Sequence, residues 1–307
     1  MHLLLPLQQM KVLAIIHGAR RLRPSVKKLF DYYTTDTRVS FQAILTHASG
    51  HAKTIASDAK GQVELIIVYG GDGLLNEVIN GLCSCSGSNP KVLVIPGGTG
   101  NDFLRNFKHS SDHNLDIVAL YNSQGCVIPI PYCKTNNEKR YFINIADVGF
   151  GGHVVSALTK FRNHLGINAS YILAVIRTFF SFKPVPMKLL INNHEFALPF
   201  FMIAVCHGST FGNGMIVGPG KNPRIAQFLV VVFGKITILD YLKNFLKLKR
   251  GIRINHPGIN YYETSALSIL TENSALFGET DGEPLAAGSF TFGYSGQEIT
   301  FLHNPFD

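Results

Sequence analysis

A strand followed by a glycine-rich turn and a helix is the pattern that most restricts how this chain can fold. The apolar run 65–69 predicts a buried strand, and Gly70, Gly71 and Gly73 follow it at once. From Leu75 onward, apolar residues recur as they would on one face of a helix. Glycine lets a backbone approach an anion closely, and a helix N-terminus offers unpaired N–H groups. The pattern therefore predicts a phosphate-binding turn.

An aspartate, Asp72, lies among these glycines. A carboxylate next to phosphates is repulsive by itself, so its presence indicates a bound cation or an ordered water between the two. The alternative is that Asp72 only caps the helix that follows it, which is a frequent role for aspartate.

A second turn of the same kind follows the apolar run 91–95, where Thr99, Asn101 and Asp102 lie among small residues. In a parallel α/β sheet both turns emerge at the carboxyl edge, where ligands bind. The two turns together predict a nucleotide phosphate site, with Asp72 and Asp102 as candidate ligands of Mg²⁺. For Asp102 the alternative is a helix cap or a link between the turns.

The predicted secondary structure changes in type near residue 125. Residues 1–125 alternate strands and helices, which predicts a three-layer α/β nucleotide-binding domain with a parallel sheet. Residues 126–292 carry short β-rich runs separated by turns, which predict an antiparallel β-sandwich domain with inserted helices. The runs 289–292 and 298–302 are predicted as two separate strands, and residues 293–307 are candidates to return to the first domain.

Composition restricts the class of partner. Lys and Arg number 28 against 20 Asp and Glu, so the net charge of +8 suits a nucleotide, an anionic lipid surface or a nucleic acid. The five cysteines lack the paired spacing of a zinc site, which predicts reduced thiols in a cytoplasmic protein. The apolar runs are too short to span a membrane.

The segment 235–253 combines six Lys or Arg residues with apolar residues at helical spacing. This pattern favours contact with an anionic membrane surface. The alternative is a solvated helix that packs on the sandwich.

Three segments give the chain a resemblance to the diacylglycerol kinase catalytic-domain family, which includes bacterial lipid kinases and sphingosine and ceramide kinases. They are Gly70-Gly71-Asp72-Gly73 with Asn76-Glu77, then Gly98-Thr99-Gly100-Asn101-Asp102-Phe103, then Asp281-Gly282-Glu283. The first segment alone also fits NAD kinases and phosphofructokinases, whereas the second and third are more specific.

The resemblance implies an enzyme that transfers the γ-phosphoryl group of ATP, with Mg²⁺, to the hydroxyl of a diacylglycerol-like or sphingoid lipid. Glu283 would be the catalytic base, with Asp281 beside it. The expected partners are a lipid acceptor and a peripheral membrane surface, with a homodimer left open and nucleic acid excluded. The residues implied to contact the nucleotide are Thr46, Gly71, Asp72, Gly73, Leu74, Leu75, Asn76, Glu77, Thr99 and Asn101.

The chain also departs from the family pattern. Leu74 replaces a threonine of the first turn, and the family's Asn-Pro-x-Ser-Gly segment is replaced by residues 17–21. Residues 223–227 lack the aspartate that helps bacterial members to hold a structural Mg²⁺, so we expect no such site here. These departures leave two alternatives: a non-catalytic lipid- or nucleotide-binding relative, and a soluble NAD-kinase-like phosphotransferase. The Asp281-Gly282 pair also fits an ordinary hairpin turn.

Overall fold

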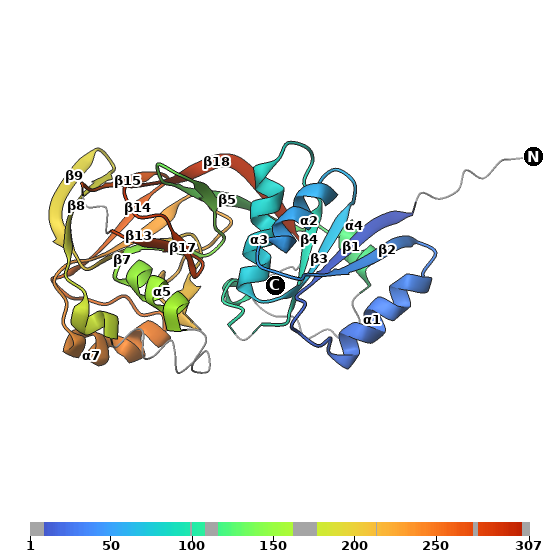
Figure 1. Cartoon of the computed structure of the whole chain (residues 1–307), viewed down its shortest axis with the longest axis horizontal. Helices are drawn as coiled ribbons and strands as arrows, with labels where there is room; N and C mark the ends of the chain where they lie inside the picture. Colours follow the sequence, from blue (N-terminus) through green and yellow to red (C-terminus); the bar gives the residue numbers. More distant parts are fainter. Residues whose placement is uncertain are drawn as a thin grey trace, which may run out of the picture. The chain divides into compact units, whose positions relative to one another are not determined.

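A computed structural model describes residues 9–98, 100–107, 116–161, 177–212, 214–272 and 276–302 of the chain (Figure 1). The chain divides into two compact units. The first comprises Met1–Ile128 and Glu298–Asp307, and the second comprises Pro129–Gln297.

A parallel sheet forms the centre of the first unit, as the alternation of strands and helices predicts. Its strands follow the order β2-β1-β3-β4, and each neighbouring pair is parallel. The elements are β1 (Met10–Ile16), α1 (Pro24–Thr35), β2 (Val39–Leu45), α2 (His51–Ala59), β3 (Leu65–Gly70), α3 (Asp72–Ser84), β4 (Lys91–Pro96), the 3₁₀ turn η1 (Leu104–Asn106) and α4 (Ile117–Asn122).

Helices cover both faces of this sheet. Alternate strand residues such as Ala14 and Ile67 pack in one buried cluster with Phe30 of α1 and Ile117 of α4. The intervening residues are equally buried and point to the opposite face, where α2 and α3 pack on β1 and β3. The predicted three-layer α/β architecture is therefore confirmed.

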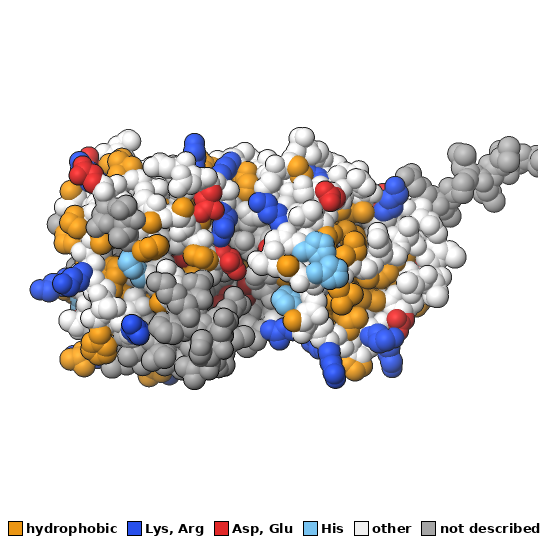
Figure 2. Space-filling model, in the orientation of Figure 1, with side chains coloured by type: hydrophobic (Ala, Val, Ile, Leu, Met, Phe, Trp, Pro, Cys, Tyr) orange, Lys and Arg blue, Asp and Glu red, His pale blue; other side chains and the backbone are white. Residues whose placement is uncertain are grey.

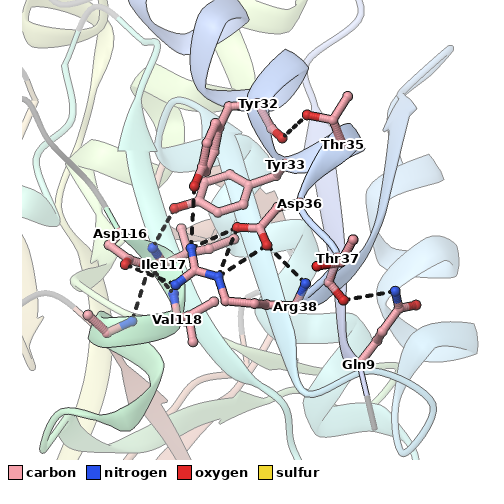
Figure 3. A network of polar contacts seen from close by, with 11 residues as sticks. Gln9, Tyr32, Tyr33, Thr35, Asp36, Thr37, Arg38, Asp116, Ile117 and Val118 are labelled. Atoms are coloured by element: carbon pink, nitrogen blue, oxygen red, sulfur yellow. Dashed lines mark hydrogen bonds and ion pairs between the residues drawn. The ribbon is translucent and has the colours of Figure 1, made fainter. Parts of the chain in front are cut away.

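A polar network joins α1 to α4 across the edge of this sheet (Figure 3). The Arg38 guanidinium donates to Asp36 and, at 3.4 Å, to Asp116, and this hydrogen bonding lowers the pKa of Asp36. Asp116 caps α4 by accepting from the Val118 and Ala119 N–H groups. The Tyr33 hydroxyl accepts the Ile117 N–H at 2.8 Å, and burial of Tyr33 raises its pKa.

Substitution Tyr33→Phe tests this network. It leaves the buried Ile117 N–H without its acceptor, which costs about 1–2 kcal/mol of local stability. We expect amide hydrogen exchange of α4, followed by mass spectrometry, to speed up about 5–30-fold. Tyr32→Phe is the control, because the Tyr32 hydroxyl accepts from the Arg38 guanidinium rather than from the Ile117 N–H. Equal protection of α4 in both variants would contradict this account.

The second unit is an antiparallel β-sandwich, also as predicted. One sheet has the order β14-β13-β10-β7-β16-β17, and its partner contains β18-β15-β8-β9 with β5 and β6. Val148 and Val230 from the first sheet share a buried cluster with Leu189 and Phe292 from the other. The elements are β5 (Cys126–Lys134), β6 (Lys139–Tyr141), β7 (Ile145–Gly149), α5 (Phe150–Phe161), β8 (Val185–Ile191), β9 (His194–Phe200), β10 (Met202–Cys206), β11 (Thr210–Phe211), β12 (Met215–Ile216), β13 (Phe228–Phe233), α7 (Ile238–Lys249), β14 (Ile259–Thr264), β15 (Leu267–Leu270), β16 (Gly278–Thr280), β17 (Glu283–Leu285) and β18 (Phe290–Phe301).

The prediction of separate strands at 289–292 and 298–302 is wrong, because β18 runs through both without a break. The glycines between the two runs resemble turn signals, but Gly293 lies inside the strand, where the Tyr132 side chain packs closely against it. A Cβ there would lie 3.1 Å from the Tyr132 hydroxyl oxygen. The start of β18 pairs with β15, and Phe301 at its end pairs in parallel with Val92 of β4.

None of the helices in the described ranges is both long and apolar enough to cross a lipid bilayer.

Candidate functional site

The two glycine turns of the first unit touch each other. The Gly97 N–H donates to the Gly70 carbonyl at 2.8 Å, just beyond the parallel strands β3 and β4. A Cβ on Gly98 would lie 2.5 Å from the Gly71 Cα and 2.9 Å from the Asn101 amide oxygen. Glycine is therefore needed at this position because two backbones meet there.

The Asp72 carboxylate joins the two turns. One of its oxygens accepts the Asp102 N–H and the other accepts the Phe103 N–H, each at 3.0 Å. Gly71 is the N-cap of α3, and no side chain caps that helix. The alternative in which Asp72 caps α3 is therefore wrong. Each carboxylate oxygen has a further lone pair, so the bridge leaves Asp72 able to face a cation.

Polar side chains also shape the second turn. Asn101, with a φ of 48°, accepts the Gly98 N–H and donates to the Gly98 carbonyl. Asp102 is buried and forms a 3.3 Å ion pair with Arg105, which also donates to the Gly100 carbonyl. Asn101 and Asp102 thus hold the shape of the turn. Thr99 lies outside the described residues.

Arginine 23 is a contributor that the sequence analysis missed. Its guanidinium donates to the Pro96 carbonyl at the end of β4, and its backbone N–H donates to the Tyr69 hydroxyl at the end of β3. The only signal in the sequence is its place soon after the first strand.

Thr46 extends the site to the other two strands of the sheet. Its hydroxyl accepts the Gly18 N–H at 3.2 Å, and a Cβ on Gly18 would overlap the Thr46 carbonyl oxygen. Gly18 follows β1 and Thr46 follows β2, so all four strands deliver a polar or glycine segment to the same carboxyl edge.

The α3 side chains at positions 74–77 already have partners inside the unit. Leu74 and Leu75 are core residues, so contact from either with a nucleotide would come from the backbone. Asn76 is also buried and accepts from Asn80. Glu77 accepts the Ala52 N–H at 3.1 Å, which caps the start of α2. Gly71 and Gly73 present backbone only.

The acidic turn of the second unit is a tight hairpin between β16 and β17. Asp281 and Gly282 both have positive φ, 50° and 86°, as a two-residue Asp-Gly hairpin requires. The Asp281 carboxylate accepts the N–H groups of residues 143, 144 and 145 at 2.8–3.1 Å. Asp281 therefore anchors the turn, while Glu283 beside it is exposed.

Two further carboxyl groups, Asp147 and Glu279, lie next to this turn and are buried. The sequence analysis did not single out Glu279. The signal available in the sequence was an acidic residue two positions before Asp281. Within the described ranges, no group of three or more His, Cys, Asp or Glu side chains is arranged to hold a metal.

Comparisons with known proteins agree with this architecture. The profile "Diacylglycerol kinase catalytic domain" matches residues 11–130, and "YegS C-terminal NAD kinase beta sandwich-like domain" matches residues 145–302. The chain belongs to the diacylglycerol kinase catalytic-domain family. A kinase family implies a nucleotide as phosphoryl donor.

Curated relatives of this family span nearly the whole chain. A protein named diacylglycerol kinase from Bacillus subtilis is 26% identical over 275 residues, covering 84% of this chain and 86% of its own. A protein named "probable lipid kinase YegS-like" from Yersinia enterocolitica is 28% identical over 282 residues, covering 89% and 88%. These names support a kinase.

Solved structures show the same fold. A diacylglycerol kinase from Bacillus anthracis superposes with a TM-score of 0.65 at 19% identity, covering 96% of this chain and 97% of its own. Yeast NADH kinase, solved with NADH, superposes with a TM-score of 0.54 at 12% identity, covering 96% and 83%.

Substitution Gly98→Ala tests whether the contact between the turns is needed for nucleotide binding. The added Cβ meets backbone atoms that cannot rotate away, so the turns must separate. We expect affinity for ATP to fall at least about 10-fold by calorimetry, while the second unit stays folded. Gly234→Ala is the control, because its Cβ would meet its nearest neighbour at 3.4 Å. Unchanged ATP affinity in Gly98→Ala would contradict the assignment.

Proposed function

We propose that this protein is an ATP- and Mg²⁺-dependent lipid kinase, which transfers the γ-phosphoryl group to the hydroxyl of a diacylglycerol-like or sphingoid lipid. The contact of two glycine turns at the carboxyl edge of a parallel sheet is the observation that carries this proposal. Their backbones and the N-terminus of α3 offer N–H groups to phosphate oxygens.

Asp72 and Asp102 fit the role of Mg²⁺ ligands. Proteins commonly bind Mg²⁺ through one or two carboxylates, with water and substrate phosphates completing the octahedron. The donors available here match that type of site rather than a cage made by protein alone. When bound, Mg²⁺ would neutralise charge on the transferred phosphoryl group.

Glu283 is the proposed general base. An alcohol attacks phosphorus poorly until its proton is accepted, and a carboxylate within hydrogen-bond reach accepts it as the new O–P bond forms. The bond to the leaving phosphate breaks in the same displacement, and ADP departs. Glu283 suits this role because it is exposed, whereas Asp281 beside it is occupied by backbone N–H groups.

The acceptor can be identified directly. The protein is incubated with γ-labelled ATP, Mg²⁺ and a total lipid extract, and the labelled product is analysed by mass spectrometry. A phosphorylated lipid supports the proposal, whereas transfer to added NAD alone would indicate a soluble phosphotransferase. ATP binding without product from either acceptor would indicate a non-catalytic relative.

Substitution Glu283→Gln should separate chemistry from binding. The amide cannot accept the alcohol proton, so we expect kcat to fall about 10²–10⁴-fold while ATP affinity changes less than about 2-fold. Glu272→Gln, an exposed acid of the same unit, is the matched control. Turnover unchanged in Glu283→Gln would remove the base assignment.

We also propose that helix α7 contacts an anionic lipid surface. Leu239, Lys243, Leu246 and Arg250 follow one another at spacings of three or four residues, so they share one face of the helix. Leu239 and Leu246 are 60% and 63% exposed. Figure 2 shows hydrophobic atoms at the surface where Figure 1 draws α7.

Charge on α7 favours phosphate headgroups as its partner. Lys247 and Lys249 in its last turn are exposed, whereas Asp240 in its first turn is engaged in a capping box with Thr237. Over the face drawn in Figure 2, Lys and Arg side chains are otherwise scattered rather than gathered in one patch. Leucines beside cations are typical of helices that lie in a membrane interface.

A double substitution, Leu239→Ser with Leu246→Ser, should weaken sedimentation with vesicles of phosphatidylglycerol and phosphatidylcholine at least about 10-fold, because two apolar insertions are lost. Leu270→Ser, an exposed leucine on β15, is the control. Binding should also weaken as salt screens the cations. Equal binding by the double variant would overturn this assignment.

A further inference from the structure

Two buried carboxyl groups face each other across neighbouring strands of the second unit. Asp147 of β7 and Glu279 of β16 occupy directly opposite positions in the antiparallel register. Their exposed fractions are 1% and 0%, and directly opposite residues project to the same face of a sheet, with Cβ atoms about 4.5–5.5 Å apart. Two negative charges this close together in a buried site repel each other strongly, which favours a single proton shared between the two carboxyl groups.

Each carboxyl group also holds a backbone N–H on its other side. Asp147 accepts the Gly152 N–H at 2.9 Å, in the first turn of α5. Glu279 accepts the Gly282 N–H, at the apex of the acidic turn. The remaining oxygens, Asp147 Oδ2 and Glu279 Oε1, are buried and have no hydrogen-bond partner in the described ranges, as expected if the two carboxyl groups share a proton.

The first turn of α5 lies close to the Asp147 carboxyl group. A Cβ on Gly151 would overlap the Asp147 carboxylate, so any larger residue at this position would displace that carboxylate. The positive end of a helix stabilises a negative charge. The arrangement therefore favours an ionised Asp147 and a neutral Glu279, whose hydroxyl donates to Asp147.

We propose that Asp147 and Glu279 form a proton-sharing pair that positions the Asp281-Gly282-Glu283 turn, and thereby the base Glu283. This inference rests on the proposed kinase function for its catalytic consequence. Asp281 ties the turn to residues 143–145 through its own carboxylate. Glu279 adds a second attachment, because its carboxyl group accepts the Gly282 N–H. The turn is therefore held at both of its central residues, Asp281 and Gly282.

The electrostatic surroundings agree with a shared proton. Burial raises the pKa of Asp147 to about 6, and burial together with Asp147 raises the pKa of Glu279 well above its usual value. Asp281 on the turn also raises the pKa of Glu279, and burial, with a contribution from Asp147, raises the pKa of the Cys206 thiol on β10. Within the described ranges, no Lys or Arg forms an ion pair with either carboxyl group.

Three variants test the pair through activity. Glu279→Gln keeps an acceptor for Gly282 and a donor for Asp147, so kcat should stay within about 3-fold of wild type. Glu279→Ala loses both, so kcat should fall about 10–100-fold while KM for ATP stays within about 3-fold. Thr280→Val, a buried and nearly isosteric neighbour, is the control and should match wild type.

The pH dependence gives a readout that packing alone would not move. The pKa of Glu279 is raised on folding, so the stability that its proton supports is complete below the unfolded value of about 4.3 and is lost as pH rises through the folded value. Between about pH 5 and about pH 9, Tm of wild type should therefore fall relative to Tm of Glu279→Gln. Loss of the shared proton should also loosen the turn, so we expect kcat of wild type to fall as pH rises through the same range. In Glu279→Gln this fall should be absent.

Two results would overturn the proposal: Glu279→Gln as inactive as Glu279→Ala, or parallel Tm profiles for wild type and Glu279→Gln. If wild type phosphorylates none of the lipids tested, the kinase proposal fails, but the comparison of Tm profiles still decides whether the pair shares a proton.

Discussion

The bridge that Asp72 makes between the two glycine turns is the interaction on which the geometry at the carboxyl edge of the parallel sheet depends. A single carboxylate accepts one N–H from Asp102 and one from Phe103, so it fixes the second turn relative to the start of α3. The backbones can come this close only because glycines face each other at 71 and 98. The Asp72 bridge, the hydrogen bond from Gly97 to Gly70 and the absence of side chains at 71 and 98 together bring the two turns into contact.

Much of the first unit could be predicted from the sequence, because buried strands and amphipathic helices have strong periodic signals and the glycine turns interrupt them clearly. The link made by Asp72 could not be predicted, since its partners are backbone N–H groups thirty and thirty-one positions later in the chain. Gly293 shows the opposite failure. Its sequence context resembles a turn, but its reason is the nearby Tyr132 hydroxyl, which only the folded chain reveals.

Three carboxyl groups in or beside the acidic turn accept backbone N–H groups. Asp281 satisfies three such groups, and Asp147 and Glu279 each satisfy one. Buried backbone N–H groups need hydrogen-bond acceptors, so these acids have a structural role. A match to a sequence motif does not distinguish that role from a catalytic one. Exposure separates the roles here, because Glu283 alone among the four reaches solvent as an exposed side chain.

The path of β18 has a consequence for biosynthesis. Its end pairs with β4, and the Leu302 N–H donates to the Val92 carbonyl at 2.9 Å. The sheet of the first unit therefore lacks one edge neighbour until the ribosome has translated most of the chain. A nascent or truncated N-terminal fragment would lack this contact, so the backbone of Val92 would be open to pairing with another chain, which favours aggregation. Phe301 and Leu302 thus protect the edge of a sheet whose other strands are translated much earlier.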